Sequence, residues 1–158
     1  GPRYVDAYAE ALPFEPASFD LVVSYLSLID IADAQTALTE MVRVLRPGGR
    51  LLIVNLNAWN TASQTRDGVW MRLDDGAVRI TIELYLKEHA YDAEWSGISV
   101  ESWHRPLAFY MQTLLQLSLE LRVFDAPAAQ DASHPYGAKF NKAPYLMMME
   151  WEKPAKMR

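Results

Sequence analysis

The stretch from Glu10 to Leu56 constrains the fold of this chain more than any other part of it. Residues Phe19–Leu28 are mostly apolar, which is typical of a strand buried on both faces. Residues 34–45 then place apolar side chains at helical spacing, directly after Asp33, a favourable N-cap residue. A second apolar run, Arg50–Leu56, predicts another strand.

The segment Arg46-Pro47-Gly48-Gly49 lies between the predicted helix and the second strand. Proline cannot continue a helix, and glycine tolerates the positive φ with which many helices end. The stretch therefore predicts one βαβ unit, with two parallel strands joined by a right-handed crossover helix.

The rest of the chain carries weaker patterns. Ala77–Leu86 alternates apolar and polar residues after a turn at Asp74–Gly76, which predicts a half-exposed strand. Trp95–Trp103 alternates in part, and we expect it to be the hairpin partner of that strand. Tyr4–Tyr8 is predicted to be a short strand, and Asn57–Asp75 a loop with one helical turn near Trp70.

Three elements are expected in the last third of the chain. Pro106 suits the first turn of a helix over Leu107–Ser118. Leu119–Phe124 is a strand candidate, and Tyr145–Trp151 is predicted to be a central strand because it is continuously apolar in its first half.

Composition excludes several classes of function. The net charge of −5 argues against a nucleic-acid surface, which is normally basic. The chain has no cysteine, which excludes disulfides and fits a cytoplasmic protein. No apolar run reaches the roughly 18 residues of a membrane span, and no metal-ligand spacing occurs. We therefore expect neither a membrane nor a metal as a partner.

Three motifs resemble one known family. They are Glu10-Ala11-Leu12-Pro13-Phe14, Ser18-Phe19-Asp20-Leu21-Val22 and Leu45-Arg46-Pro47-Gly48-Gly49-Arg50-Leu51-Leu52. In this order they look like the central part of class I S-adenosylmethionine-dependent methyltransferases. Trp103–Leu107 and the stretch from Pro144-Tyr145 through Lys153-Pro154 resemble, more weakly, the C-terminal part of bacterial small-molecule methyltransferases of that class.

The resemblance implies an α/β fold: a partial Rossmann-like methyltransferase sheet with an antiparallel last strand beside the strand at Leu51. It implies one domain over residues 1–158, with residues 59–105 as a cap inserted over the substrate side. It also implies S-adenosylmethionine as the cofactor and a small molecule as the substrate.

The glycine-rich turn that the family uses to hold its cofactor is not found in this sequence. Glycine occurs only at positions 1, 48, 49, 68, 76, 97 and 137, so no Gly-x-Gly exists. By resemblance, we expect the back portion of a methyltransferase, which binds the cofactor weakly or not at all. We also expect the outer edge of the strand at Phe19–Leu28 to be covered, by a second copy in a homodimer or by the N-terminal residues.

By resemblance, two short segments face the cofactor. They comprise Tyr8, Ala9, Glu10, Ser24, Tyr25 and Leu26. Tyr8 stands where the family usually has an acidic residue, so a simple packing role is an equal alternative. Asp6 could substitute for that acid only if the strand shifted.

Methyl transfer from a sulfonium needs orientation and, for some substrates, a base. Asp30, just after a strand end, and His104, just before a helix, are the candidate catalytic bases, and His89 is a weaker third candidate. The structural alternatives are a loop cap for Asp30 and a hydrogen bond at the helix start for His104. His89 and His134 are expected to be ordinary surface residues.

The candidate substrate-binding residues are Asn57, Trp59, Tyr85, Trp103 and Arg105. Arg105 could clamp a carboxylate, or form a surface ion pair instead. The aromatic residues, together with Trp70 and Trp95, could line an apolar pocket, or simply pack the cap.

These observations favour a small-molecule methyltransferase. The alternative is a non-catalytic binding or dimerisation module with a degenerate methyltransferase fold, which the missing glycine turn favours. A third hypothesis, a nucleotide-binding enzyme such as a dehydrogenase, is disfavoured because no phosphate-binding loop occurs.

Overall fold

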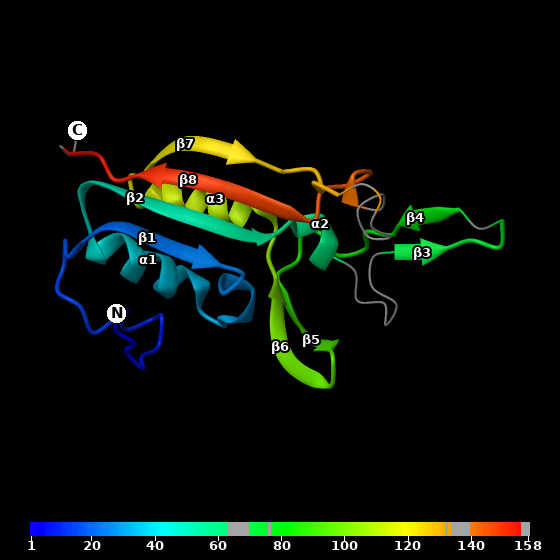
Figure 1. Ribbon diagram of the computed structural model, residues 1–158, viewed down its shortest axis with the longest axis horizontal. Coiled ribbons are helices and arrows are strands. Elements are labelled where there is room, and N and C mark those ends of the chain that lie inside the picture. The colour runs from blue at the N-terminus through cyan, green and yellow to red at the C-terminus, as the bar shows by residue number, and fades with distance from the viewer. Residues whose placement is uncertain (63–69, 76, 132, 134–139, 156–158) are drawn as a thin grey trace.

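A computed structural model describes residues 1–62, 70–75, 77–131, 133 and 140–155. Its centre is a four-stranded sheet, in the order β1 (Phe19–Tyr25), β2 (Leu45–Leu56), β8 (Leu146–Glu152) and β7 (Glu120–Asp125) (Figure 1). Strand β1 runs parallel to β2, and β8 runs antiparallel to both of its neighbours. The predicted α/β fold, with one mixed sheet and an antiparallel, central last strand, is confirmed.

Helix α1 (Ala34–Val44) forms the crossover of the predicted βαβ unit. The Asp33 carboxylate accepts a hydrogen bond from the backbone N–H of Thr36 at 3.0 Å, which satisfies one of the free donors of the first turn. After the helix, Gly48 adopts φ +80°. At Gly49 a Cβ atom would lie 2.9 Å from the Arg46 carbonyl oxygen, so only glycine fits.

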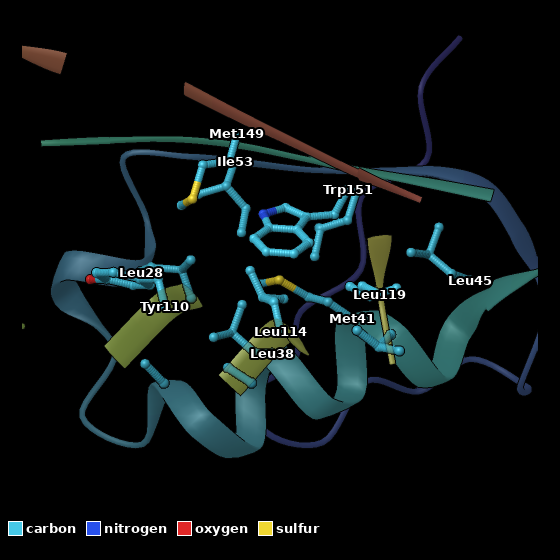
Figure 2. Close-up of a cluster of buried hydrophobic side chains, with 14 of the residues drawn as sticks. Leu28, Leu38, Met41, Leu45, Ile53, Tyr110, Leu114, Leu119, Met149 and Trp151 are labelled. Carbon is cyan, nitrogen blue, oxygen red and sulfur yellow. The ribbon is translucent and has the colours of Figure 1, made fainter. Parts of the chain in front are cut away.

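Helix α3 (Leu107–Gln116) and α1 lie on the same face of the sheet. The hydrophobic core fills the space between these two helices and the sheet (Figure 2). Trp151, Met149 and Ile53 project from β8 and β2 toward the helices, and all three are fully buried. Burying one such side chain contributes about 1.5–3 kcal/mol. The alternating burial along β8 follows from the period of two along a strand.

Strand β1 lies at one edge of the sheet, as predicted. The side chains of Leu21, Val23 and Tyr25 point away from the helices, and each is more than half exposed. Coverage of this edge by a second copy remains a prediction. The strand predicted at Tyr4–Tyr8 is wrong: these residues form no strand and are exposed, because no neighbouring strand of the described residues pairs with them.

Two hairpins are inserted between β2 and α3, after the short helix α2 (Ala58–Thr61). Strand β3 (Trp70–Arg72) pairs with β4 (Val78–Ile80), so the helical turn predicted near Trp70 is wrong. Strand β5 (His89–Trp95) pairs with β6 (Ile98–His104).

The long strand predicted at Ala77–Leu86, and its pairing with Trp95–Trp103, are therefore wrong as well. Only Val78–Ile80 is a strand, because its partner β3 offers three residues to pair with. Beyond it the chain leaves the ladder, and Leu86 is 87% exposed. The sequence pattern indicated where apolar and polar residues alternate along a segment, but not which segment pairs with it.

The β5–β6 hairpin projects beyond the end of the sheet at which β1 and β2 terminate (Figure 1). It contacts the loop after β1 through the short 3-10 turn η1 (Leu28–Asp30). The division into one domain with residues 59–105 as a cap stays a prediction. Within the described part of the chain, no helix has the length and apolar character that crossing a membrane requires.

Candidate functional site

A cavity of about 530 Å³ lies where β1 and β2 end and the β5–β6 hairpin begins. Its apolar wall comes from the loop after β1 and the end of β2, through Leu26, Ile29 and Leu56. In open α/β sheets, ligands bind at the carboxyl ends of the strands, and this volume is in the range of small-molecule sites. The cavity is therefore the candidate site.

The rest of the lining is mostly polar and comes mainly from the hairpin. It contains Tyr91, Ala93, Glu94 and Ser102, with Asp30 from η1 and Tyr145 from the segment before β8. The hydroxyl of Ser102 donates a hydrogen bond of 2.7 Å to the Asp30 carboxylate. This bond ties the loop after β1 to the hairpin and orients Asp30 at the cavity.

Tyr91 faces Ser102 across the β5–β6 ladder. Burial, reinforced by the negative charge of Asp30, raises the pKa of Tyr91 to about 12. Burial also raises the pKa of Tyr145. Both phenols therefore stay protonated near neutral pH and can donate hydrogen bonds, whereas the carboxylates of Asp30 and Glu94 are the groups of this wall that can accept a proton.

Arg105 holds the loop after β1 against the hairpin and α3. Its guanidinium, which is fully buried, donates to the backbone carbonyls of Leu28 (3.0 Å), Ile31 (2.8 Å) and Ala32 (2.8 Å). It also forms an ion pair of 2.7 Å with Glu88. We call this set of contacts the Arg105 latch.

The contacts of the Arg105 latch occupy the guanidinium N–H groups that Arg105 would need in order to bind a substrate carboxylate. Arg105 lines no part of the cavity described above, and its charge is directed at backbone oxygens and Glu88. The geometry therefore favours the ion-pair alternative for Arg105, in a buried rather than a surface setting, and gives it a positioning role on the loop that carries Asp30.

His104 is also directed into the protein. Its Nε2 lies 2.8 Å from the Tyr85 carbonyl oxygen, which can only accept, so Nε2 carries the proton. Its Nδ1 lies 2.7 Å from the Thr61 hydroxyl. Burial lowers the pKa of His104, so the ring is neutral. Both nitrogens are thus occupied by Thr61 and Tyr85, and His104 makes no hydrogen bond at the start of α3, so the predicted structural alternative is wrong in its partner. Its role as a base stays a prediction.

The expectation that His89 is an ordinary surface residue is wrong. Its side chain is 8% exposed, its Nδ1 contacts the Lys87 carbonyl oxygen at 2.8 Å, and its ring lies 5.0 Å from that of His104. Burial follows from its position at the start of β5, directly opposite His104 in the ladder. His134 lies outside the described residues.

The other predicted substrate residues are not among those that line the cavity. The Trp103 ring lies 5.2 Å from the Arg105 guanidinium, and the Tyr85 ring 5.9 Å from that of His104. Asn57 is the nearest, since its N–H donates to the Tyr145 carbonyl at 2.8 Å. Trp59 is half-buried in α2. Their substrate roles stay predictions, and the side chains of Trp70 and Trp95 lie outside the described residues.

Of the six predicted cofactor residues, only Leu26 lines the cavity. Leu26 turns the chain after β1 with φ +52°. The hydroxyl of Ser24 is paired with that of Ser27 at 2.8 Å, and Tyr25 is 63% exposed. Tyr8 is 82% exposed.

Ala9 and Glu10, the remaining two, are half-buried. The described residues therefore do not enclose S-adenosylmethionine, and we derive no chemical step from it. Among the same residues, no group of three or more His, Asp or Glu side chains could hold a metal ion.

Sequence reasoning missed four residues of the polar wall: Tyr91, Glu94, Ser102 and Tyr145. Three of them lie on the β5–β6 hairpin, and β5 was not predicted. The sequence of β5 does carry a period of two that could have indicated a strand, because His89, Tyr91, Ala93 and Trp95 alternate with residues 90, 92 and 94. Asp30 and Leu26 were predicted, and the structure places both at the cavity.

The first third of the chain matches a known family. Residues 1–53 match the sequence profile described as "Methyltransferase domain". The ubiquinone/menaquinone biosynthesis C-methyltransferase UbiE of Hahella chejuensis is 52% identical over 55 residues, 35% of this chain and 22% of that protein. The UbiE of Pasteurella multocida is 48% identical over 55 residues, 35% of this chain and 20% of that protein. The matched part thus spans about a fifth of the length of these relatives.

Solved structures match nearly the whole chain. An S-adenosylmethionine-dependent methyltransferase from Mesorhizobium loti superposes with a TM-score of 0.81 at 21% identity, over 92% of this chain and 67% of that one. The [4+2]-cyclase SpnF also matches, with a TM-score of 0.52 at 14% identity, over 95% of this chain and 56% of that one. At these identities the likeness concerns the fold.

Proposed function

We propose that this chain, which carries the sequence pattern and the fold of class I S-adenosylmethionine-dependent methyltransferases, forms the acceptor-binding side of an enzyme that methylates a small molecule. The observation that carries the proposal is the cavity at the carboxyl ends of β1 and β2, closed by the β5–β6 hairpin. Three of its lining residues, Leu26, Ile29 and Asp30, belong to residues 1–53, which match the methyltransferase domain.

The residues of the cavity suit this function. Leu26, Ile29 and Leu56 supply an apolar wall that holds an acceptor and excludes water. Asp30, fixed by Ser102, can take the proton that an acceptor group loses. S-adenosylmethionine, when bound, would supply an electrophilic methyl group on a sulfonium. Tyr8, Ala9, Glu10, Ser24, Tyr25 and Leu26 are proposed to form its wall in this chain.

The curated relatives are named for ubiquinone and menaquinone biosynthesis. A quinone-type acceptor is consistent with the apolar wall of the cavity. The match that suggests it covers 35% of this chain, so it supports the class of reaction more than the acceptor.

A non-catalytic binding module is the second candidate. The exposed Tyr8, together with the absence of a Gly-x-Gly from this sequence, favours it. The likeness to SpnF, which is named as a [4+2]-cyclase, does not separate the two candidates, because one fold can serve different chemistries.

Methyl transfer separates the two candidates. The polypeptide that carries this chain is incubated with S-adenosylmethionine bearing an isotope-labelled methyl group and a small-molecule extract, and labelled products are detected by mass spectrometry. We expect labelled product, and Asp30→Asn to lower its rate about a hundredfold. Asp20→Asn, at the opposite end of β1, is the matched control and should leave the rate unchanged. Absence of any labelled product supports the binding module instead.

A further inference from the structure

The charge of the cavity restricts what it can bind. Two carboxylates, Asp30 and Glu94, line it, and no lysine, arginine or histidine does so among the residues that the structure describes. An anionic acceptor would place like charges together without a compensating donor. The raised pKa of Tyr91 points the same way, because the charge of Asp30 contributes to it.

The cation of the Arg105 latch is directed away from the cavity. The guanidinium of Arg105 donates to the backbone oxygens of Leu28, Ile31 and Ala32, and pairs with Glu88. Its side chain is fully buried. Turning it toward a ligand would leave these carbonyls unsatisfied, which is costly in a buried setting. Arg105 therefore does not neutralise Asp30 and Glu94.

The remaining lining suits a cation with an apolar body. Tyr91 and Tyr145 add aromatic rings, which attract cations, and their protonated phenols add no negative charge. Leu26, Ile29 and Leu56 offer apolar contact on the other side.

We propose that the acceptor of this cavity is an organic amine with an apolar body, bound as its ammonium form by Asp30 and Glu94. This rests on the proposed function, because it uses the same cavity and names the class of its substrate. This proposal excludes acceptors that carry a carboxylate or a phosphate group.

The chemistry balances with Asp30 as the base. An ammonium nitrogen has no lone pair, so one proton first passes from it to the Asp30 carboxylate. S-adenosylmethionine, when bound, would supply an electrophilic methyl group to the freed lone pair. The nitrogen–carbon bond would form as the carbon–sulfur bond breaks, the bonding pair would stay on sulfur, and the positive charge would move to the nitrogen.

Binding to the chain itself tests the proposal without the cofactor. Three probes of similar shape are titrated by calorimetry at pH 7: 2-phenylethylamine, 2-phenylethanol and 3-phenylpropanoate. We expect the amine to bind about tenfold more tightly than the alcohol, as one charge-assisted hydrogen bond would give. The carboxylate should bind most weakly of the three.

Variants locate the effect in the cavity. Asp30→Asn should weaken amine binding about tenfold and leave the alcohol unchanged. Ser102→Ala removes the hydrogen bond to Asp30 but keeps the carboxylate, so it should retain the preference for the amine. Asp20→Asn, outside the cavity, should change nothing. Circular dichroism establishes that each variant is folded.

Several results would overturn the proposal: no binding of the amine, equal or tighter binding of the carboxylate, or an unchanged amine affinity in Asp30→Asn. Amine binding without methyl transfer in the labelling experiment would reject the proposed function and leave this inference standing. Transfer to a carbon or phenol acceptor, with no amine binding, would reject this inference alone.

Discussion

The central sheet and the β5–β6 hairpin are held in place by different forces. The sheet packs on α1 and α3 through fully buried apolar side chains such as Trp151 and Leu38 (Figure 2). The hairpin is held by buried polar contacts: the Arg105 latch binds the loop after β1, and His104 contacts Thr61 of α2 and the Tyr85 carbonyl. Apolar packing tolerates small shifts, whereas a hydrogen bond is lost once its geometry fails.

This difference explains why the candidate site lies between the two parts. A hairpin held by directional contacts returns to one position relative to η1, and so fixes Ser102 against Asp30. The sheet supplies the rigid apolar wall. The predictions below probe first the sheet, then the hairpin, then the cavity between them.

The largest effect is expected in the sheet. Trp151→Ala should lower the free energy of unfolding by about 3–5 kcal/mol, because it removes a fully buried aromatic side chain from the core. Tyr25→Ala, on the exposed face of β1, should change it by less than about 0.5 kcal/mol. Denaturant titration measures both, and similar losses in the two variants would contradict the assignment of the core.

A smaller loss is expected from the hairpin. Arg105→Met keeps an apolar stem but leaves the carbonyls of the latch without their donor, which should cost about 2–3 kcal/mol. Arg105→Lys retains the charge but lacks the fork of donors, so it should restore only part of the loss. Full stability of the Lys variant, measured in the same titration, would show that charge alone suffices.

The hairpin should also loosen in acid. Because burial lowers the pKa of His104 below 6.5, the unfolded state takes up a proton first as the pH falls. The contribution of His104 to stability is therefore present above pH 6.5 and is lost as the pH drops through its folded pKa. His104→Gln should lack this part of the pH dependence. Identical pH profiles for the two proteins would contradict the neutral, buried histidine.

The smallest effect concerns the cavity itself. Ultraviolet titration of the phenols should show Tyr91 ionising near pH 12, and Asp30→Asn should lower that pKa because it removes one of its causes. Since the folded pKa is raised above the ordinary value of 10, the stability that Tyr91 contributes should fall between pH 10 and about 12. If the pKa of Tyr91 is the same in Asp30→Asn as in the wild type, the charge of Asp30 does not act on Tyr91, which would contradict this prediction.

The sheet could be predicted from the sequence because its elements carry their own patterns. Apolar residues at helical spacing identified α1, and the apolar run of β8 indicated a central strand. The Pro47-Gly48-Gly49 stop placed the helix end to within a few residues, but these residues belong to β2, which begins at Leu45 and not at the predicted Arg50. Tyr4–Tyr8 and Ala77–Leu86 failed for one reason. Strand formation depends on a pairing partner, and alternation along one segment does not reveal it.

The site could be predicted only in part. Asp30 and Leu26 were found because they follow a strand end, where α/β proteins bind ligands. Arg105 and His104 were recognised as unusual, but whether such a side chain faces a ligand or the backbone depends on contacts 43 to 77 residues distant in the chain. Tyr91 and Ser102 came from a hairpin whose pairing the sequence left open.

Peptide-resolved hydrogen exchange in the wild type and Arg105→Met tests most directly whether the latch holds the hairpin at the site. The expected result is a joint loss of protection in β5, β6 and residues 28–32, with β2 and β8 unchanged. A uniform loss across the sheet and the hairpin, or no change in the hairpin at all, would contradict it.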